Sequence, residues 1–571
     1  MRSVLLLLAL GCLSCAPKVS EDAKFESLAH NYIEAQLRMN PEWATTLGDH
    51  RYDQRVSDYS LEGVRAERAL SAAYLDSLSH VEVAALSPVN RIDCRIMTTN
   101  LAFTLFSIDT LREHEWNPLN YNPGSAIYSL LAREFAPLDA RLESVRHRLR
   151  AVPGILRAAR SNLKNPPRIF TETAIQQNAG TIALVKDDLK DFIAKSSLSA
   201  EGKAAMQAAQ DTARLALEAF GAWMQKDLLP ASTGDFRLGE ERFRRKFFYA
   251  LESDITPEEV MHSAESDLGR TREAMYQCAL PLFRGFFPNA GPSDTAAVIK
   301  RVLDRLAERH PENETIVALA QEDLAQATAF VRVQDLVSVP NEPVKVIVMP
   351  EFERGVAVAY CEAAGPLEKN GETFYTISPT PKDWSAQRVG SFFREYNNYM
   401  LLDLTVHEAM PGHYLQLAHA NQFHAPTMIR ALFSSGTFVE GWATYAEQLM
   451  AERGYGGAEF KMEQLKMRLR LIINAILDQR IHMRGMTEKE AMDLMMREGF
   501  QEEGEAAGKW RRACLSSTQL STYYVGNMEL NALRTAYQAK FGAQDTLRTM
   551  HDAILSLGSP APRYVREGLG L

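Results

Sequence analysis

The sequence predicts a mainly α protein, a large helical fold with a central cleft and a small β-sheet. Long stretches of helix-forming residues carry apolar side chains every three or four positions, and strand-like sequence is confined to two short segments. With 571 residues, the chain can bury a large core in more than one structural region. We expect an N-terminal helical region, 16–230, and a C-terminal region, 231–571, with the cleft between them. This boundary is soft, so one continuous domain stays possible.

Two long segments show the helix signals most fully. In the first, residues 200–228, helix formers run throughout and apolar residues recur at three- and four-residue intervals. In the second, residues 257–283, Thr256 precedes Pro257 and two glutamates, a cap followed by a first-position proline and first-turn acids. Both segments are therefore predicted to be helices.

The remaining elements are shorter. VKVIVMP (344–350) and ETFYTISPT (372–380) are rich in β-branched and aromatic residues, and they flank a turn that contains glycine. These two segments predict a small sheet. The segment 487–500 opens on Thr487 with Glu490 three residues later, which is a capping box at the start of a helix.

The N-terminus, MRSVLLLLALGCLSC, is typical of an export signal covering residues 1–15. Arg2 precedes the apolar run 4–10, which is too short to span a bilayer. Cys12 and Cys15 follow, as in a bacterial lipoprotein signal, and Ser14 favours Cys15 over its rival Cys12 as the lipidated residue. A plain secretory signal is the alternative. Either way we expect an exported protein of the periplasm or cell envelope, attached to the membrane only through its lipid.

The formal net charge of −9 argues against nucleic-acid binding, because binding to phosphates needs a basic face. The other cysteines, Cys94, Cys278, Cys361 and Cys514, are widely separated and form no C-x-x-C pair. They are therefore not a finger-type zinc site, and we interpret them as buried single cysteines. The oligomeric state is left open by the sequence.

HEAMPGH, residues 407–413, resembles the zinc motif H-E-x-x-H but has its second histidine two positions late. In a straight helix, residues six apart point to nearly opposite faces, so His407 and His413 could not bind one metal ion. Pro411 cannot continue the helix, however, and Gly412 tolerates unusual backbone angles. A bulge at these two residues would turn His413 back toward His407. The preceding segment, 394–408, has an apolar face and is predicted to be helical.

A catalytic zinc site needs a general base and a third ligand. Glu408 follows the first histidine, where a zinc hydrolase places the carboxylate that takes a proton from the attacking water. The candidate third ligand is Glu440 in FVEGWATYAEQL (438–449), with Glu447 seven residues later on the same helix face, able to orient a histidine. On spacing alone, Glu440 could equally be a solvated carboxylate of the first helical turn.

The segments REYNNYMLLDLTVHEAMPGHYLQLAHAN (394–421) and EGWATYAE (440–447) resemble the bacterial family called domain of unknown function 885, which is similar to gluzincin metallopeptidases. The segments 164–177, 235–260 and 480–495 also resemble family segments, so the likeness covers nearly all of the mature chain. The resemblance implies a mostly helical, metallopeptidase-like fold with a cleft. It implies one Zn²⁺ on His407, His413 and Glu440, with Glu408 as the catalytic carboxylate.

Two weaker positions come from the same resemblance. STYYVGNMEL (521–530) is similar to the family's Tyr-x-x-Gly segment, which makes Tyr523 a candidate to stabilise an oxyanion, with Tyr524 as its rival. A buried structural tyrosine is the alternative. DQRIH (478–482) matches an Asp-x-x-x-His element, so His482 is a candidate contact to the substrate or oxyanion. Arg480 stands where the family has a small residue, so this chain departs from the family pattern at that position.

From these residues we expect an exported zinc metallopeptidase that cleaves short peptides with a water molecule activated by the metal and Glu408. One alternative is a zinc-containing binding lipoprotein without turnover, although such a protein would not need Glu408 beside the metal. Another is a hydrolase of a non-peptide amide, which would use the same residues. The sequence does not determine the cleaved bond, the exo- or endopeptidase mode or the physiological metal.

Overall fold

The computed structural model describes residues 20–571 except 293, 350–357, 369–370, 383 and 543–544. The predicted signal segment, with Cys12 and Cys15, lies outside the described residues. Along the described chain, helices dominate and three strands form one small sheet, so the predicted mainly α class with a small sheet is confirmed. No helix in this part of the chain is long and apolar enough to cross a membrane.

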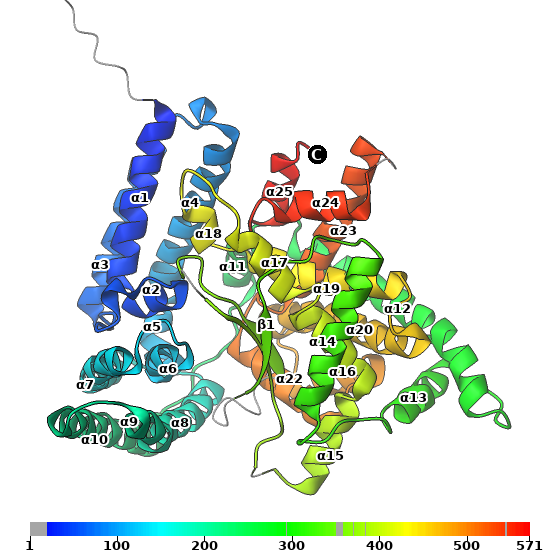
Figure 1. The fold of residues 1–571 in the computed structure, drawn as a ribbon, viewed down its shortest axis with the longest axis horizontal. Coiled ribbons are helices and arrows are strands. Elements are labelled where there is room, and N and C mark those ends of the chain that lie inside the picture. The colour runs from blue at the N-terminus through cyan, green and yellow to red at the C-terminus, as the bar shows by residue number, and fades with distance from the viewer. Residues whose placement is uncertain (1–19, 293, 350–357, 369–370, 383, 543–544) are drawn as a thin grey trace, which may run out of the picture.

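The first half of the chain forms a helical region on one side of the molecule, coloured blue to teal in Figure 1. Its helices are α1 (Glu21–Met39), α2 (Pro41–Leu47), α3 (Leu61–Ser79), α4 (Pro88–Phe106), α5 (Glu113–Trp116), α6 (Gly124–Ala132), α7 (Leu138–Asn162), α8 (Arg168–Ala183), α9 (Leu189–Lys195) and α10 (Ala200–Trp223). The predicted helix 200–228 thus appears as α10, whose last turn is widened into a π-helix at Met224–Leu228.

The second half supplies the other side of the molecule. Its helices are α11 (Glu240–Leu251), α12 (Pro257–Phe286), α13 (Thr295–Leu306), α14 (Ile316–Val333), α15 (Ala386–Glu395), α16 (Asn398–Glu408), α17 (His413–Asn421), α18 (Ile429–Leu432), α19 (Gly436–Glu452), α20 (Gly457–Arg484), α21 (Glu488–Asp493), α22 (Glu503–Leu515), α23 (Ser521–Phe541), α24 (Leu547–Leu555) and α25 (Pro562–Gly568). The helix starts predicted at Thr256 and Thr487 are confirmed, because both threonines form complete capping boxes.

The sheet differs from a simple pair of strands. β1 (Val344–Val348) and β3 (Thr373–Ile377) fall where strands were predicted, but they pair in parallel, with Val344 opposite Thr373. A third strand, β2 (Ala359–Glu362), was not predicted and pairs antiparallel with the other edge of β3. The strand order is therefore β1-β3-β2, which leaves β2 at an edge of the sheet.

The long helix α20 runs through the interior, and several other helices of the C-terminal half pack against it. Leu469, Ile472, Ile473 and Leu477 are fully buried along it, against α12 on one side and α23 on another. Burial on all sides explains why α20 has little amphipathic pattern. The two halves also share a core, because Ile429 and Tyr564 pack with apolar residues of α1 and α4. The boundary near residue 230 stays a prediction.

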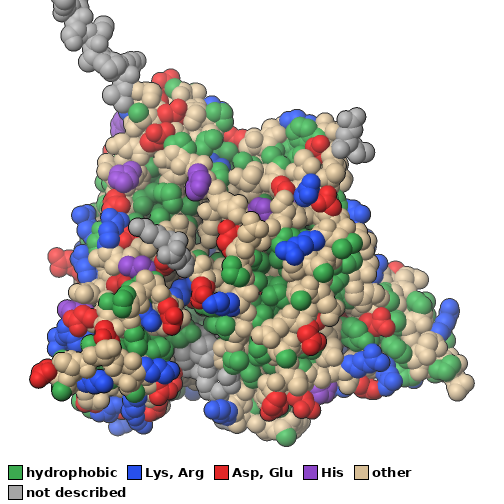
Figure 2. All heavy atoms as spheres, viewed as in Figure 1, with side chains coloured by type: hydrophobic (Ala, Val, Ile, Leu, Met, Phe, Trp, Pro, Cys, Tyr) green, Lys and Arg blue, Asp and Glu red, His purple; other side chains and the backbone are tan. Residues whose placement is uncertain are grey.

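On the face shown in Figure 2, acidic and basic side chains are interspersed, with green apolar surface between them. This pattern is usual for a protein surface, where apolar atoms contribute more than half of the exposed area.

A buried histidine of α24, His551, connects this helix to α19 by a hydrogen bond. His551 is fully buried; its Nδ1–H donates to the Leu336 carbonyl at 2.6 Å, and its Nε2 accepts from the Tyr445 hydroxyl at 2.8 Å. Burial lowers the pKa of His551 to about 4. This pKa is lower than the ordinary value of about 6.5, so the neutral ring favours the folded state above pH 6.5, and this stability is lost as the pH falls toward 4.

We therefore expect acidification from pH 6.5 to 4 to cost the parent protein about 3 kcal/mol through His551 alone. The variant His551→Gln should be less stable than the parent at pH 7, but the difference should shrink as the pH falls. Urea denaturation of both proteins at several pH values between 7 and 4 measures this. A difference that stays constant with pH would contradict a neutral buried His551.

Candidate metal centre

The two histidines of HEAMPGH are brought together by a break in the helix. α16 ends at Glu408 and α17 begins at His413, so the bulge expected from the sequence is a full interruption, residues 409–412. The Met410–Pro411 peptide bond within it is cis. The imidazole rings of His407 and His413 lie 4.7 Å apart between centroids and nearly perpendicular to each other. Two helices, rather than one distorted helix, therefore present the two rings.

Gly412 is required by the close return of the chain. A Cβ atom at this position would lie 1.9 Å from the His407 carbonyl oxygen and 2.4 Å from that of Val406. The Gly412 N–H donates to the Val406 carbonyl at 2.9 Å, and the Trp442 indole N–H donates to the Pro411 carbonyl at 2.8 Å. The interruption is thus fastened both to α16 and to α19.

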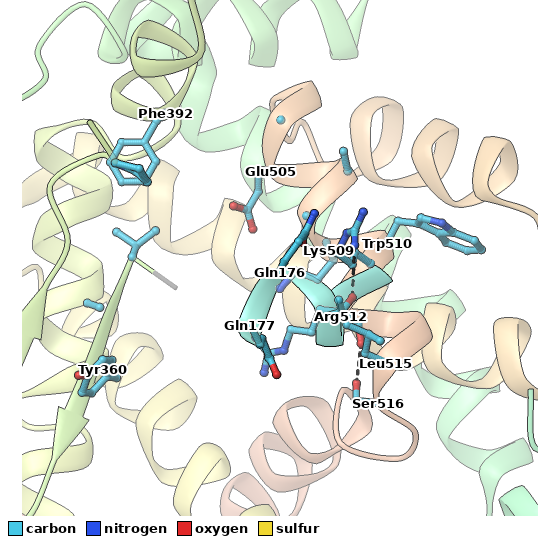
Figure 3. Close-up of a pocket in the computed structure, with 18 of the residues that line it drawn as sticks. Gln176, Gln177, Tyr360, Phe392, Glu505, Lys509, Trp510, Arg512, Leu515 and Ser516 are labelled. Carbon is cyan, nitrogen blue, oxygen red and sulfur yellow. Dashed lines mark hydrogen bonds between the residues drawn. The ribbon is translucent and has the colours of Figure 1, made fainter. Parts of the chain in front are cut away.

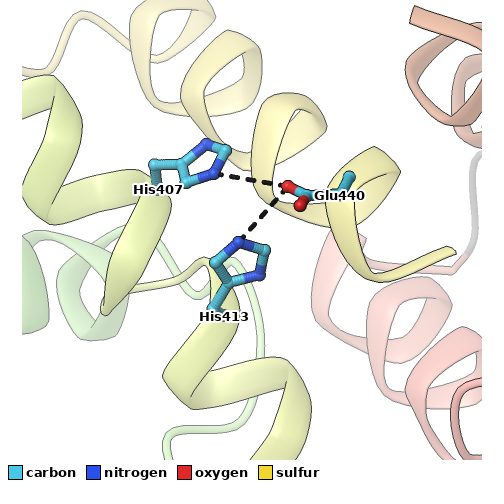
Figure 4. Close-up of side chains that lie close together, drawn as sticks. All are labelled: His407, His413 and Glu440. Atoms are coloured by element: carbon cyan, nitrogen blue, oxygen red, sulfur yellow. Dashed lines mark ion pairs between the residues drawn. The ribbon is translucent and has the colours of Figure 1, made fainter. Parts of the chain in front are cut away.

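Glu440, in the first turns of α19, points at both histidines (Figure 4). Its Oε2 lies 3.6 Å from Nε2 of His407 and 3.5 Å from Nε2 of His413. These separations are long for hydrogen bonds, but they are close to the roughly 3.4 Å between ligand atoms around a tetrahedral ion with bonds of about 2.1 Å. Within the described chain, these three residues are the group whose ligand atoms could hold a metal ion.

The electrostatics of Glu440 suit a ligand better than a solvated carboxylate. Burial by itself raises the pKa of the Glu440 carboxyl, but the two imidazoles outweigh burial and hold this pKa well below its ordinary value. Its Oε2 is buried and has no hydrogen-bond donor among the described residues. Two imidazoles and one ionised carboxylate, with an oxygen that lacks a donor, match the ligand types that a catalytic zinc ion takes.

Glu447 orients the first histidine from behind. It is fully buried and lies two helical turns after Glu440 on the same face of α19. Its Oε1 accepts from Nδ1–H of His407 at 2.6 Å. This bond orients the His407 ring, with Nε2 on the side of His413 and Glu440, where a metal ion would be bound.

Removing this bond should weaken metal binding without abolishing it. We expect Glu447→Ala to lower zinc affinity about 10- to 100-fold, because the ring of His407 loses its orientation. Competition with a chelator measures the affinity. The control is Glu452→Ala, on the same helix, where the carboxylate pairs with Arg534 near the surface. Equal zinc affinity for the parent and Glu447→Ala would refute the orienting role.

Glu408 lines a large cavity beside the three residues. Its Oε2 accepts from the backbone N–H of Cys361 at 3.0 Å, so the edge strand β2 holds the carboxylate in place. This contact could not be found from the sequence, because β2 has only four residues and no clear alternation. The cavity measures about 2600 Å³.

Helices from both halves form the cavity walls. Figure 3 shows Lys509 and Arg512 of α22 close to Gln177 of α8, with Tyr360 and Phe392 on the opposite side. α22 lies beside α8, and the two are joined by a hydrogen bond from Arg511 to Thr173. The predicted site residues His407, Glu408, Glu447 and Tyr523 all line this cavity.

The structure distinguishes Tyr523 from Tyr524. The Tyr523 hydroxyl faces the cavity and accepts from Arg512 at 2.8 Å, whereas the Tyr524 hydroxyl donates to Asp267 at 2.7 Å, away from it. The glycine of the Tyr-x-x-Gly segment brings α23 against α19. A Cβ atom on Gly526 would lie 2.1 Å from the Thr437 carbonyl oxygen, so only glycine permits this approach. Tyr523 is thereby placed on the same cavity as His407 and Glu408.

His482 is not brought to the site. It lies outside the cavity lining, and its Nε2 contacts the carbonyl oxygens of Ala513 and Ser516 at 3.0 and 2.8 Å. Asp478, four residues earlier, accepts from the N–H groups of Thr518 and Ser521. The Asp-x-x-x-His element therefore fastens the turn that precedes α23, and a contact of His482 with substrate is not supported by this geometry. Arg480 pairs with Glu265 near the surface.

Comparisons with known proteins agree with this fold. The family model described as "Bacterial protein of unknown function (DUF885)" matches residues 41–569. A solved structure from Shewanella oneidensis, described as a candidate lipoprotein of unknown function, is 33% identical, covers 96% of this chain and 100% of its own, and has a TM-score of 0.81. A candidate lipoprotein from Colwellia psychrerythraea has the same fold at 16% identity, with a TM-score of 0.81 and coverage of 97% and 99%. No curated protein matches the chain.

Proposed function

The chain belongs to the DUF885 family of bacterial proteins, whose function is unknown, and we propose from its site that it is a zinc-dependent hydrolase of peptide bonds. The observation that supports the proposal is the convergence of His407, His413 and Glu440 from three helices, with Glu408 next to His407 on the cavity. This arrangement has the elements of the gluzincin type, in which two histidines and a glutamate hold the metal and a second glutamate acts as base.

His407, His413 and Glu440 would hold one zinc ion, with Glu447 orienting the first of them. A bound zinc would lower the pKa of a water molecule to about 7 and polarise the carbonyl of the scissile bond.

Glu408 would take the proton from the attacking water and pass it to the leaving amine. Its Oε2 accepts from the backbone N–H of Cys361 at 3.0 Å, the one hydrogen-bond donor to this carboxylate among the described residues. The other oxygen, Oε1, is left to receive the proton. A general base of this kind is worth about 10²- to 10⁴-fold in rate.

Tyr523 would donate a hydrogen bond to the oxyanion that forms on the substrate. Its oxygen accepts from Arg512 at 2.8 Å and from Gln519 at 3.4 Å, so its own O–H hydrogen is directed elsewhere. Burial, reinforced by the negative charge of Glu440, raises the pKa of Tyr523, so the hydroxyl keeps its proton at neutral pH.

The cavity favours short peptides as substrates. Its volume of about 2600 Å³ exceeds that of a typical small-molecule pocket, while walls from α8, β2, α16 and α22 surround it. A folded protein would not reach Glu408 between these walls, but an extended peptide of several residues would.

We also propose that the protein is an exported lipoprotein anchored through Cys15, or through Cys12 if cleavage falls earlier. The N-terminal sequence supports this, as does the description of the Shewanella oneidensis relative as a candidate lipoprotein. The periplasm or cell envelope would then be its compartment.

The test is the metal content of the mature protein lacking residues 1–15. We expect about one zinc per chain in the parent and in the control Glu452→Ala, and marked loss in Glu440→Ala and His413→Ala. A mixture of short peptides, followed by mass spectrometry, then shows whether the zinc form cleaves peptide bonds. Absence of tightly bound metal in the parent would overturn the proposal. Zinc binding without cleavage would favour a binding lipoprotein or a hydrolase of another amide.

A further inference from the structure

One wall of the cavity is a face of α22 that carries charge. Glu505, Lys509, Arg512 and Ser516 follow one another at intervals of four, three and four residues, so they lie along a single side of the helix. All four line the cavity. The polar face of α22 is thus turned inward, toward the space in which a substrate would lie.

Lys509 is buried on this wall without a partner. It is 8% exposed, and within the described chain its ammonium group makes no hydrogen bond and no ion pair. Lys466, also buried, differs in this respect, because it donates to Glu395 at 3.0 Å. A buried ammonium group that makes no hydrogen bond or ion pair is costly, so a bound anion at this place would stabilise it.

The nearby carboxylates are already engaged. Glu395 accepts from both Lys466 and Arg470, and Glu505 accepts from the Tyr396 hydroxyl at 2.9 Å and lies 3.7 Å from Arg470. Two cations and two carboxylates thus satisfy one another. Lys509 lies near these four side chains but makes no hydrogen bond or ion pair with any of them.

Arg512 adds a second cation without a carboxylate partner. Among the described residues, it donates to the neutral oxygens of Gln519, at 3.0 Å, and Tyr523, at 2.8 Å. Arg512 thus lines the cavity without an ion pair to any carboxylate in the described chain, one helical turn from Lys509. The pKa of Lys509 is lowered to about 7, mainly by burial and also by the charge of Arg512, which together outweigh the opposing effect of Glu505. A bound carboxylate would restore the charged form.

We propose that Lys509 and Arg512 form a subsite that binds a carboxylate group of the substrate peptide. The proposal rests on the proposed peptidase function and gives it a substrate class. Since Arg512 also holds Tyr523, the bound carboxylate lies next to the oxyanion donor and close to the bond that is cut. A free C-terminal carboxylate at this place makes the protein an exopeptidase that releases short C-terminal pieces. An acidic side chain of the substrate would present the same carboxylate group, and the experiment below distinguishes it from a free C-terminus.

The experiment measures binding in the Glu408→Gln background, so that it does not depend on turnover. The probes are acetyl-Ala-Ala with a free C-terminus, its C-terminal amide, and acetyl-Ala-Glu amide, each titrated by calorimetry. We expect one carboxylate probe to bind about 10- to 100-fold more tightly than acetyl-Ala-Ala amide, as for a charge-assisted hydrogen bond. Preference for the free C-terminus identifies the exopeptidase mode, and preference for the glutamyl amide identifies an acidic side chain.

The matched variants are Lys509→Met, Lys509→Arg and Arg511→Met. Lys509→Met should remove the preference for the carboxylate, Lys509→Arg should retain most of it, and Arg511→Met, on the same helix but bonded to Thr173, should leave it unchanged. Zinc itself binds carboxylates, so only the part of the preference for carboxylate probes that is lost in Lys509→Met is evidence for the subsite. Equal binding of all three probes, or a preference that survives Lys509→Met, would overturn this subsite. Failure of peptide cleavage in the parent would affect the proposed function alone.

Discussion

Glu408→Gln is expected to lower kcat for peptide hydrolysis about 10²- to 10⁴-fold while zinc stays at one ion per chain. Glutamine has the same shape as glutamate, and its amide oxygen can still accept from the Cys361 N–H. The metal ligands are untouched. The amide cannot take a proton from water, however, so the loss should fall on kcat rather than on KM. Steady-state kinetics with a cleaved peptide, together with metal analysis of the same sample, measures both quantities.

The control for this variant is Glu362→Gln, which alters another carboxylate on the same cavity. Glu362 lies one residue beyond Cys361 on β2 and is 3.3 Å from Arg133. Its replacement removes one negative charge from the wall without removing a base, so kcat should change little. If both variants lost activity equally, the negative charge of the cavity rather than the base would be responsible. Full activity in Glu408→Gln would remove Glu408 from the mechanism.

Gly412→Ala should abolish tight metal binding although it alters no ligand. The added methyl group would lie 1.9 Å from the His407 carbonyl oxygen and 2.4 Å from the Val406 carbonyl oxygen. Both are backbone atoms of α16, so relief requires the chain between α16 and α17 to move. His413 would then shift away from His407 and Glu440. We expect zinc affinity to fall more than 100-fold and the free energy of unfolding to fall by about 3 kcal/mol, at the upper end for overpacking.

A glycine in open space provides the matched control. Gly269 lies within α12, and a Cβ atom there would meet nothing within 4 Å. Gly269→Ala should therefore stabilise the protein by about 1 kcal/mol through helix propensity and leave zinc binding unchanged. Chelator competition and urea denaturation of the three proteins give both readings. Normal zinc affinity in Gly412→Ala would mean that the interruption can rearrange without moving His413.

Much of the framework could be predicted from local sequence. The capping boxes at Thr256 and Thr487, the helix predicted over 200–228 and the strand segments β1 and β3 depend on neighbours a few residues apart, and such signals survive in any tertiary context. The same holds for HEAMPGH, because Pro411 must end the helix wherever it is placed. The presence of a small sheet was therefore predictable, whereas the parallel pairing of β1 with β3 was not.

The roles of Glu440, Tyr523 and Lys509 were decided only by the tertiary structure, because they depend on groups far apart in the chain. The spacing left Glu440 equally a ligand or a solvated acid, and it is the packing of α19 on α23, with Gly441 against Gly526, that turns it toward the histidines. The choice of Tyr523 over Tyr524 depends on which side of α23 faces the cavity. Lys509 carried no local signal, because a lysine on a helix usually faces water. Within the described chain it makes no ion pair, because the neighbouring carboxylates Glu395 and Glu505 already bind other side chains. These pairs form only when α15, α20 and α22 pack together.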